Sequence, residues 1–517
     1  MRTFKPIVSG LVGFGLSLSC TVAASADEGL EALFANNCAA CHGMDRGGYI
    51  APALNKDNQG EVDPSALAYI ITNGVDGTLM PAWKGRLSEK QILDLATYFT
   101  KAPKREVKWT MADVKNSLTV YVADESTLPK QPVYGIENMD DLVAVTSRGT
   151  RARDTSRVVF FNGKNNEIVG SIPTNYAPHI VDYDPANERW AYVKTDGGRI
   201  YKVDLYSMKA VRSVQVGFGG PSLAVSWDGK YLAAGSFVPN TAVILKADTL
   251  EPVKFLDLKG VDPDGKMVEA DSGSITATPY GPYFSISLEM AGQVWIADLS
   301  KPGIPLTKIM NVGRHLHDSF LTDKSGRYMA IAAYDDKKMA VIDFKDKKVV
   351  KDIPAGCVIH TGSGAVTEVD GRYIGIGTNF GAPCKDKGTI VTAFDAKTFE
   401  VIKQIPVIGG SESPAAHPAS PYIVVDIISG NEAGKIQAID KKTLEVVKTI
   451  DVGGHSHFPE FTADGKYLYV SAGYAGNKLV IYDGKTLAKV KEVAMEVPAG
   501  IFSHVRPKIV TIGLPQG

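Results

Sequence analysis

The stretch "ADGKYLYVS" (463–471) joins an Asp-Gly turn to an alternating strand. Glycine accepts the positive φ that a tight hairpin turn requires, so the stretch predicts a turn between two β-strands. The same pattern occurs earlier in the chain as "WDGKYLAAG" (227–235), "KSGRYMAIA" (324–332) and "VDGRYIGIG" (369–377). The stretch therefore belongs to a repeated unit.

A second marker sets the length of the repeat at about 45 residues, a period typical of propellers and arrays. It is a hairpin of the form apolar–Asp–x–Lys/Thr–x–x–apolar. Its eight copies are "FFNGKNNEIV" (160–169), "VDLYSMKAV" (203–211), "LKADTLEPV" (245–253), "IADLSKPGI" (296–304), "VIDFKDKKV" (341–349), "AFDAKTFEV" (393–401), "AIDKKTLEV" (438–446) and "IYDGKTLAK" (481–489). Short apolar runs and the lack of a long helical pattern predict an all-β eight-bladed β-propeller over residues 104–517.

The segment before the repeats contains "FANNCAACHGMDRGGY" (34–49). Cys38, Cys41 and His42 form the C-x-x-C-H pattern of covalent haem c attachment. Two thiols one helical turn apart can each bond one vinyl group of a porphyrin, while the adjacent imidazole reaches the iron. The abutting histidine favours this interpretation over a redox pair or half of a zinc site. We expect His42 to be one axial ligand and Met80, in "GTLMPAW" (77–83), to be the other.

A helix is expected to begin after Ser88, which is a good N-cap, and to bury one apolar face. That face comprises Ile92, Leu95, Ala96 and Phe99. Residues 27–103 therefore resemble a small all-α class I cytochrome c. The segments "APALN" (51–55) and "MPAW" (80–83) are similar to the haem-packing loops of that family.

The first 26 residues have the features of a cleaved signal peptide: Arg2 and Lys5, an apolar run, and Ala24-Ser25-Ala26 as an A-x-A cleavage site. A lipoprotein at Cys20 is disfavoured by the residues before it. The protein is thus expected in the periplasm, with no membrane span. A formal net charge of −1 without a basic block argues against nucleic acid as a partner.

Repeat phase predicts which loops share a face. The Asp-Gly turns join the first and second strands of each blade, so the loops entering the first strands lie on the opposite, upper face. So do the loops between the second and third strands. Six of the nine histidines precede a first strand, and we expect them at one central opening: His179, His315, His317, His360, His455 and His457. His417 occupies a turn position instead and is expected at the surface.

The loop "TSRGTRARDTSR" (146–157) lies between a second and a third strand. Guanidinium groups bind carboxylates in a bidentate manner, so its arginines suit a ligand that carries carboxylates, although a solvated loop is an equal alternative. The arginines are Arg148, Arg151, Arg153 and Arg157. Tyr334, Asn379 and Tyr474 share the upper face. Cys357 and Cys384 lie on two upper loops of one blade and could form a disulfide.

A haem c domain followed by such a propeller resembles the group of cytochrome cd1 nitrite reductase and dihydro-haem d1 dehydrogenase. The resemblance covers nearly the whole mature chain. "NYAPHI" (175–180) is similar to the segment whose histidine ligates haem d1 iron, which implies that role for His179. "HLHDSF" (315–320) and "VIHTGSG" (358–364) are similar to the segments with the distal histidines of nitrite reductases, here His317 and His360.

The resemblance implies a covalent haem c, a non-covalent haem d1 or its dihydro precursor, and three possible functions. Departures such as "GGHSHFPEF" (453–461) favour the dehydrogenase, which converts a propionate to an acrylate, with His317, His360, His455 or His457 as general base. Retention of both distal histidines favours nitrite reduction to nitric oxide. The third alternative is a binding propeller without catalysis. Implied partners are the tetrapyrrole, a small soluble electron-transfer protein and other haem d1 assembly proteins.

Overall fold

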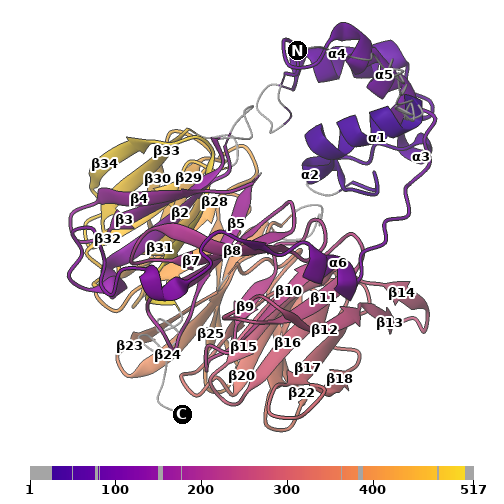
Figure 1. The fold of residues 1–517 in the computed structure, drawn as a ribbon. Helices are drawn as coiled ribbons and strands as arrows, with labels where there is room; N and C mark the ends of the chain where they lie inside the picture. Colours follow the sequence, from indigo (N-terminus) through magenta and orange to yellow (C-terminus); the bar gives the residue numbers. More distant parts are fainter. Residues whose placement is uncertain are drawn as a thin grey trace, which may run out of the picture.

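A computed structural model of the protein describes residues 26–48, 51–75, 80, 82–149, 155–175, 177–362, 364–381, 388–473 and 477–506. The predicted signal peptide therefore lies outside the described residues, apart from Ala26. Helices gather at the N-terminal end of the chain and strands make up the rest (Figure 1). Within the described part, no helix is both long enough and apolar enough to cross a membrane.

The N-terminal helices form a small domain with its own apolar core. They are α1 (Ala26–Asn37), α2 (Ala39–His42), α3 (Lys56–Gln59), α4 (Pro64–Asn73) and α5 (Glu89–Phe99). Helix α5 begins with a capping box, in which Ser88 and Gln91 satisfy each other's backbone N–H groups. Its predicted apolar face is buried against Phe34, Leu67 and Trp83. A further short helix, α6 (Met111–Asn116), leads into the strands.

The described residues contain eight antiparallel sheets of four or five strands, besides one separate two-stranded hairpin, and these eight sheets confirm the predicted eight-bladed propeller. From the axis outward the first blade is β35 (Pro498–Ser503), β2 (Leu142–Ser147), β3 (Arg157–Asn162) and β4 (Glu167–Pro173). The second is β5 (Pro178–Tyr183), β6 (Trp190–Thr195), β7 (Arg199–Asp204), β8 (Lys209–Gln215) and β1 (Thr119–Val120). The third is β9 (Leu223–Val225), β10 (Tyr231–Ser236), β11 (Thr241–Lys246) and β12 (Pro252–Asp257). The fourth is β15 (Ser272–Thr278), β16 (Tyr283–Leu288), β17 (Gln293–Asp298) and β18 (Leu306–Ile309).

The remaining blades follow the same order. The fifth is β19 (Leu316–Leu321), β20 (Tyr328–Ala333), β21 (Lys338–Asp343) and β22 (Lys348–Pro354). The sixth is β23 (Ala365–Val369), β24 (Arg372–Gly377), β25 (Thr389–Asp395) and β26 (Val401–Val407). The seventh is β27 (Pro414–Ala416), β28 (Tyr422–Ile427), β29 (Lys435–Asp440) and β30 (Val446–Asp451), and the eighth is β31 (His457–Phe461), β32 (Tyr467–Ser471), β33 (Lys478–Asp483) and β34 (Lys489–Ala494). A separate hairpin, β13 (Lys259–Val261) and β14 (Met267–Glu269), projects before the fourth blade.

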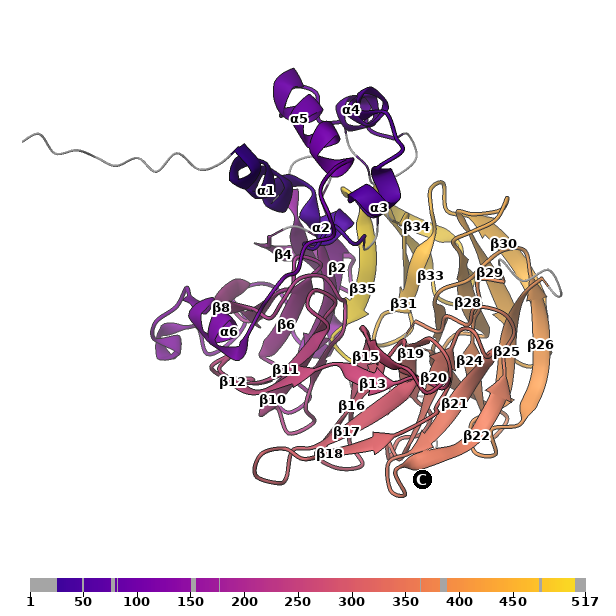
Figure 2. The ribbon, with the colours of Figure 1, turned by 90° about the vertical axis from the view of Figure 1, so that its right-hand side faces the viewer.

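Eight buried apolar clusters hold the ring together, one between each pair of neighbouring blades. The last strand, β35, pairs with β2 and so completes the first blade with residues from the opposite end of the chain. Figure 2 shows β22, β26 and β30 on the rim and β31, β15 and β19 towards the middle. Each blade must bury both faces against its neighbours, which is why these strands consist mainly of apolar residues.

Each sequence marker has one constant place in the blades, and that of the Asp-Gly turns is the predicted one. All eight hairpins of the second marker connect a third strand to a fourth. The Asp-Gly and Ser-Gly turns connect first and second strands, as between β9 and β10 at Asp228-Gly229. The inner strands therefore all begin at one end of the ring. We keep the name upper face for that end.

Candidate functional site

A cavity of about 540 Å³ lies along the axis of the ring and is lined by the inner strands of the blades. Its size is within the range of pockets that hold small ligands and cofactors. His179, His317, His360 and His457 all line it, although nearly three hundred residues separate the first from the last. The structure therefore brings four of the six predicted histidines together at the upper end of one cavity.

His179, near the start of β5, is held by two neighbours through one ring nitrogen. Its Nδ1 lies 2.9 Å from Oδ1 of Asp196 and 3.3 Å from Nη1 of Arg148. Arg148 and Asp196 also form a buried ion pair. A carboxylate on Nδ1 orients an imidazole and leaves Nε2 available to a metal. Burial, followed by the charge of Arg148, keeps the pKa of His179 well below its usual value, so the ring is neutral as iron ligation requires.

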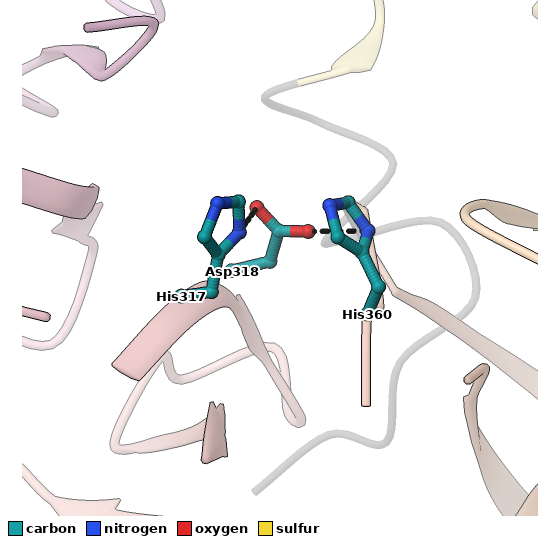
Figure 3. A group of neighbouring side chains, drawn as sticks. All are labelled: His317, Asp318 and His360. Atoms are coloured by element: carbon teal, nitrogen blue, oxygen red, sulfur yellow. Dashed lines mark hydrogen bonds and ion pairs between the residues drawn. The ribbon is translucent and has the colours of Figure 1, made fainter. Parts of the chain in front are cut away.

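His317 and His360 share one carboxylate between them. Oδ1 of Asp318 lies 3.0 Å from Nδ1 of His317, and Oδ2 lies 2.9 Å from Nδ1 of His360 (Figure 3). The ring of Tyr334 stacks on the imidazole of His317 with 4.9 Å between the centroids, and this contact fixes the plane of the imidazole. The ligand atoms of His317, Asp318 and His360 all lie within 4.8 Å of one another, and both Nδ1 atoms face oxygens of Asp318 at hydrogen-bonding distance, so the structure shows an ion-paired group.

His457, the first residue of β31, is buried and held at both nitrogens. Its Nε2 lies 3.0 Å from Oε2 of Glu412, and its Nδ1 donates to the backbone carbonyl of Ala499. Glu412 is itself fixed by Asp426, whose carboxylate accepts the backbone N–H groups of Glu412 and Ser413. The ring of His457 therefore has one defined orientation at the cavity wall.

Alternating charges set the protonation of these groups. Burial lowers the pKa of His360, but the carboxylates of Asp318 and Glu412 outweigh it and raise the value to about 9. Burial raises the pKa of Glu412, but His457 and His360 outweigh it and lower the value to about 2. The pKa of His317 is raised in the same way, by Asp318 and then Glu289 against the effect of burial. At neutral pH a protonated imidazole, His360, therefore lies beside an ionised carboxylate, Glu412, in this part of the cavity.

Other predicted residues lie elsewhere. The side chain of His455 is exposed and does not line the cavity, and that of His315 lies at the rim beside Tyr334. Arg148 lines the cavity but is paired with Asp196, whereas Arg157 is exposed. Arg151, Arg153, Tyr474 and Cys384 lie outside the described residues, so their predicted roles stay predictions, as does the disulfide of Cys384 with Cys357.

The expectation that His417 lies at the surface was wrong. Its side chain is 6% exposed, since Nδ1 accepts the backbone N–H of Ala419 and Nε2 lies 3.1 Å from the carbonyl of Ala463. The ring thus joins two neighbouring turns at the face opposite the site. His504, which the sequence left unassigned, is buried with Nε2 2.9 Å from the carbonyl of Glu188.

The carboxylates of the site were not predicted from the sequence. Asp196 and Glu289 lie between second and third strands, and Glu412 lies two residues before an inner strand. These are the two loop classes that the repeat phase assigns to the upper face. The positions of these carboxylates in the repeat could therefore have indicated them, as those of the histidines and arginines did.

The N-terminal domain fits covalent haem c at the predicted residues. Helix α2 places Cys41 and His42 directly after Cys38. The Nδ1 of His42 lies 2.7 Å from the carbonyl oxygen of Pro52, to which it can donate, so Nε2 is left for iron. Burial lowers the pKa of His42 and keeps the ring neutral. Cys38 and Met80 pack against the apolar core of this domain, where a porphyrin would be shielded from water.

Comparisons with known proteins agree with both parts of the structure. The Cytochrome D1 heme domain family matches residues 137–507, and the family described as cytochrome C oxidase, cbb3-type, subunit III matches residues 25–99. The chain is 28% identical to dihydro-heme d1 dehydrogenase of Pseudomonas aeruginosa over 95% of this chain and 97% of that protein. It is 26% identical to nitrite reductase of Stutzerimonas stutzeri over 70% of this chain and 68% of that protein.

A solved structure of dihydro-heme d1 dehydrogenase NirN in complex with DHE superposes with a TM-score of 0.74 at 26% identity. The match covers 93% of this chain and 99% of that one. It therefore includes the helical domain as well as the ring. Since the first family match spans well over half of the 517 residues, the chain belongs to the Cytochrome D1 heme domain family.

Proposed function

We propose that this protein is a periplasmic oxidoreductase that oxidises dihydro-haem d1 to haem d1. The observation that carries the proposal is the presence of two kinds of histidine in one cavity. His179, neutral and backed by Asp196, suits an iron ligand. Three other histidines, His317, His360 and His457, are interleaved with carboxylates, which suit proton transfer. The full-length similarity to dihydro-heme d1 dehydrogenase supports the same assignment.

The reaction converts a –CH₂–CH₂– unit of a propionate side chain into –CH=CH–. Two C–H bonds break and one C–C π bond forms, so two protons and two electrons leave the substrate. Haem c on Cys38 and Cys41 would supply a one-electron acceptor, and a small soluble electron-transfer protein would take the electrons onward. The chain itself must bind the macrocycle, orient the propionate and accept the protons.

The residues of the cavity divide these tasks. His179 holds the substrate iron through Nε2, while Arg148 and Asp196 keep its ring oriented. The aromatic walls, including Phe237 and Phe458, exclude water from the macrocycle. The proton acceptor is the pair of His457 and Glu412. When Nδ1 of His457 holds its proton toward the carbonyl of Ala499, Nε2 of this ring of fixed orientation has the lone pair, and the ionised carboxylate of Glu412 stabilises the proton that the ring takes up.

Nitrite reduction is the second candidate, favoured by one observation. His360 has a pKa of about 9, so it is protonated at neutral pH beside His317 and could donate a proton to nitrite. In that case haem d1 would be a resident cofactor and electrons would run inward from haem c.

One experiment separates the two candidates from each other and from a binding protein. The protein is purified from a host that makes haem d1 and is then supplied, in separate assays, with dihydro-haem d1 and with nitrite. We expect haem d1 to form from the dihydro compound with reduction of haem c, and no nitric oxide to form from nitrite. Nitric oxide production by protein that retains haem d1 would instead establish the reductase. Binding of dihydro-haem d1 without its oxidation would show that the protein is a tetrapyrrole-binding protein and not an enzyme.

Replacing Asp196 with Asn should weaken tetrapyrrole binding about 10- to 100-fold, the usual cost of losing a carboxylate partner of a metal-binding histidine. The change removes the charge that orients His179 and leaves Arg148 buried without its counter-ion. The measurement is a titration of the absorption change on adding dihydro-haem d1. Asp336→Asn, an exposed upper-face carboxylate beside the backbone of Arg314, is the control. An unchanged dissociation constant for Asp196→Asn would show that Asp196 does not position His179 for the iron.

A further inference from the structure

Four histidines and three carboxylates form one continuous alternating series around the upper face. In order they are His315, Glu289, His317, Asp318, His360, Glu412 and His457. Five successive blades, the fourth to the eighth, contribute to it. We call this set the His–carboxylate arc.

Every carboxylate of the arc presents one oxygen to each of two histidines. Glu289 places Oε2 at 3.7 Å from His315 and Oε1 at 3.8 Å from His317. Asp318 divides its oxygens between His317 and His360 at 3.0 and 2.9 Å. Glu412 divides its own between His360 at 3.9 Å and His457 at 3.0 Å.

The two central histidines use both ring nitrogens in the series. His317 faces Asp318 with Nδ1 and Glu289 with Nε2, and His360 faces Asp318 with Nδ1 and Glu412 with Nε2. An imidazole can accept a proton at one nitrogen and release another from the second nitrogen. A proton can therefore cross each ring without any side chain carrying it through space.

The ends of the arc differ in their access to solvent. The side chain of His457 is 6% exposed and faces the cavity, whereas that of His315 is 35% exposed at the rim. Between them, Glu289 is 9% exposed, and its Oε1 makes no hydrogen bond to any described residue. An unsatisfied buried carboxylate oxygen costs free energy, so a native structure that keeps one needs a reason for it. Transient proton transfer to or from His317 is such a reason.

We propose that the His–carboxylate arc is a proton relay, which carries the protons released in the cavity from His457 to solvent at His315. The inference rests on the proposed function and adds the route by which the protons leave. His457 and Glu412 take a proton from the substrate side chain, and each transfer along the arc moves a proton to the next group. The last step releases it from His315 to water, which resets the arc for the second proton.

The three contacts of 3.7 to 3.9 Å are longer than hydrogen bonds. Contacts of that length are closed by a small side-chain rotation or bridged by a water molecule. They lie on both sides of the central His317–Asp318–His360 group. That group would therefore exchange protons with each end in separate steps.

The relay is tested with Glu289→Gln and His315→Asn, which break it far from His457. Both variants should lower the turnover of dihydro-haem d1 by about tenfold or more, because proton release becomes limiting. The solvent deuterium isotope effect on turnover should rise, and small imidazole buffers should restore His315→Asn. Glu269→Gln removes a carboxylate that is 63% exposed on β14 and serves as the matched control. Wild-type turnover and isotope effect in both arc variants, with active wild-type protein, would overturn the relay.

A second measurement uses the tetrapyrrole-free protein, so it does not depend on turnover. The histidine ring signals are followed by NMR over pH in protein with ¹⁵N-labelled histidine. In the wild type His317 faces Glu289, Asp318, His360 and Tyr334, and Glu289 helps to raise its pKa. Glu289→Gln should lower the pKa of His317, and an unmoved titration would show that the two groups do not exchange protons. Inactive wild-type protein would refute the proposed function instead.

Discussion

Replacing His457 with alanine is expected to slow oxidation of dihydro-haem d1 by about 10²- to 10⁴-fold, the contribution of a general base held in place. The substitution removes the ring that Glu412 and the carbonyl of Ala499 orient at the cavity wall. It also leaves Oε2 of Glu412 without the ring nitrogen that lies 3.0 Å from it. The rate is measured by the growth of the haem d1 spectrum under single-turnover conditions.

Two further measurements show that the loss is chemical rather than structural. The covalent haem c spectrum of His457→Ala should match that of the wild type, because the helical domain has its own core. Binding of dihydro-haem d1 should remain within about threefold, since the contacts of His179 with Asp196 and Arg148 do not involve His457 and one hydrogen-bonded contact contributes little. Turnover at the wild-type rate would remove His457 from the mechanism.

The second large effect is expected from Cys38→Ser combined with Cys41→Ser. Without the two thiols no covalent haem can form, and the electrons leaving the substrate have no acceptor within the chain. Turnover coupled to an external electron-transfer protein should therefore fall below detection. Covalent haem is quantified from its absorption in denatured protein.

The ring should be unaffected by this double substitution. Its eight inter-blade clusters do not include any of the first 100 residues. The variant should therefore still show the absorption change on binding dihydro-haem d1. Continued turnover with the external acceptor would mean that electrons bypass haem c.

The architecture could be predicted from the sequence because the same hairpin pattern occurs once in every blade. Eight copies of one hairpin left little freedom in the number of blades, and the turn "ADGKYLYVS" fixed which loops share a face. The same reasoning brought His179, His317, His360 and His457 to one cavity. A C-x-x-C-H pattern is similarly local, so it needs no tertiary information.

The repeat pattern could not predict the direction in which each side chain points. His455 lies only two residues before His457, the first residue of β31, yet only His457 turns into the cavity, because the carbonyl of Ala499 on the neighbouring strand holds its Nδ1. Arg148 was expected to meet a ligand carboxylate, but Asp196 meets it first. His417 shows the converse, since a turn position does not imply exposure when an adjacent turn packs over it. Each outcome depends on a contact between segments remote in sequence.

Strand β35 is the last strand of the described residues but stands innermost in the first blade, and this order decides when the cavity is completed. Ala499 in that strand holds His457, and the carbonyl of Val497 just before it accepts the backbone N–H of Arg148. A chain without β35 can form seven complete blades, but its first blade lacks the inner strand and the cavity lacks part of its wall. The cavity is therefore complete only after β35 has been added. A polypeptide truncated before β35 could carry its c-type haem but could not oxidise the macrocycle.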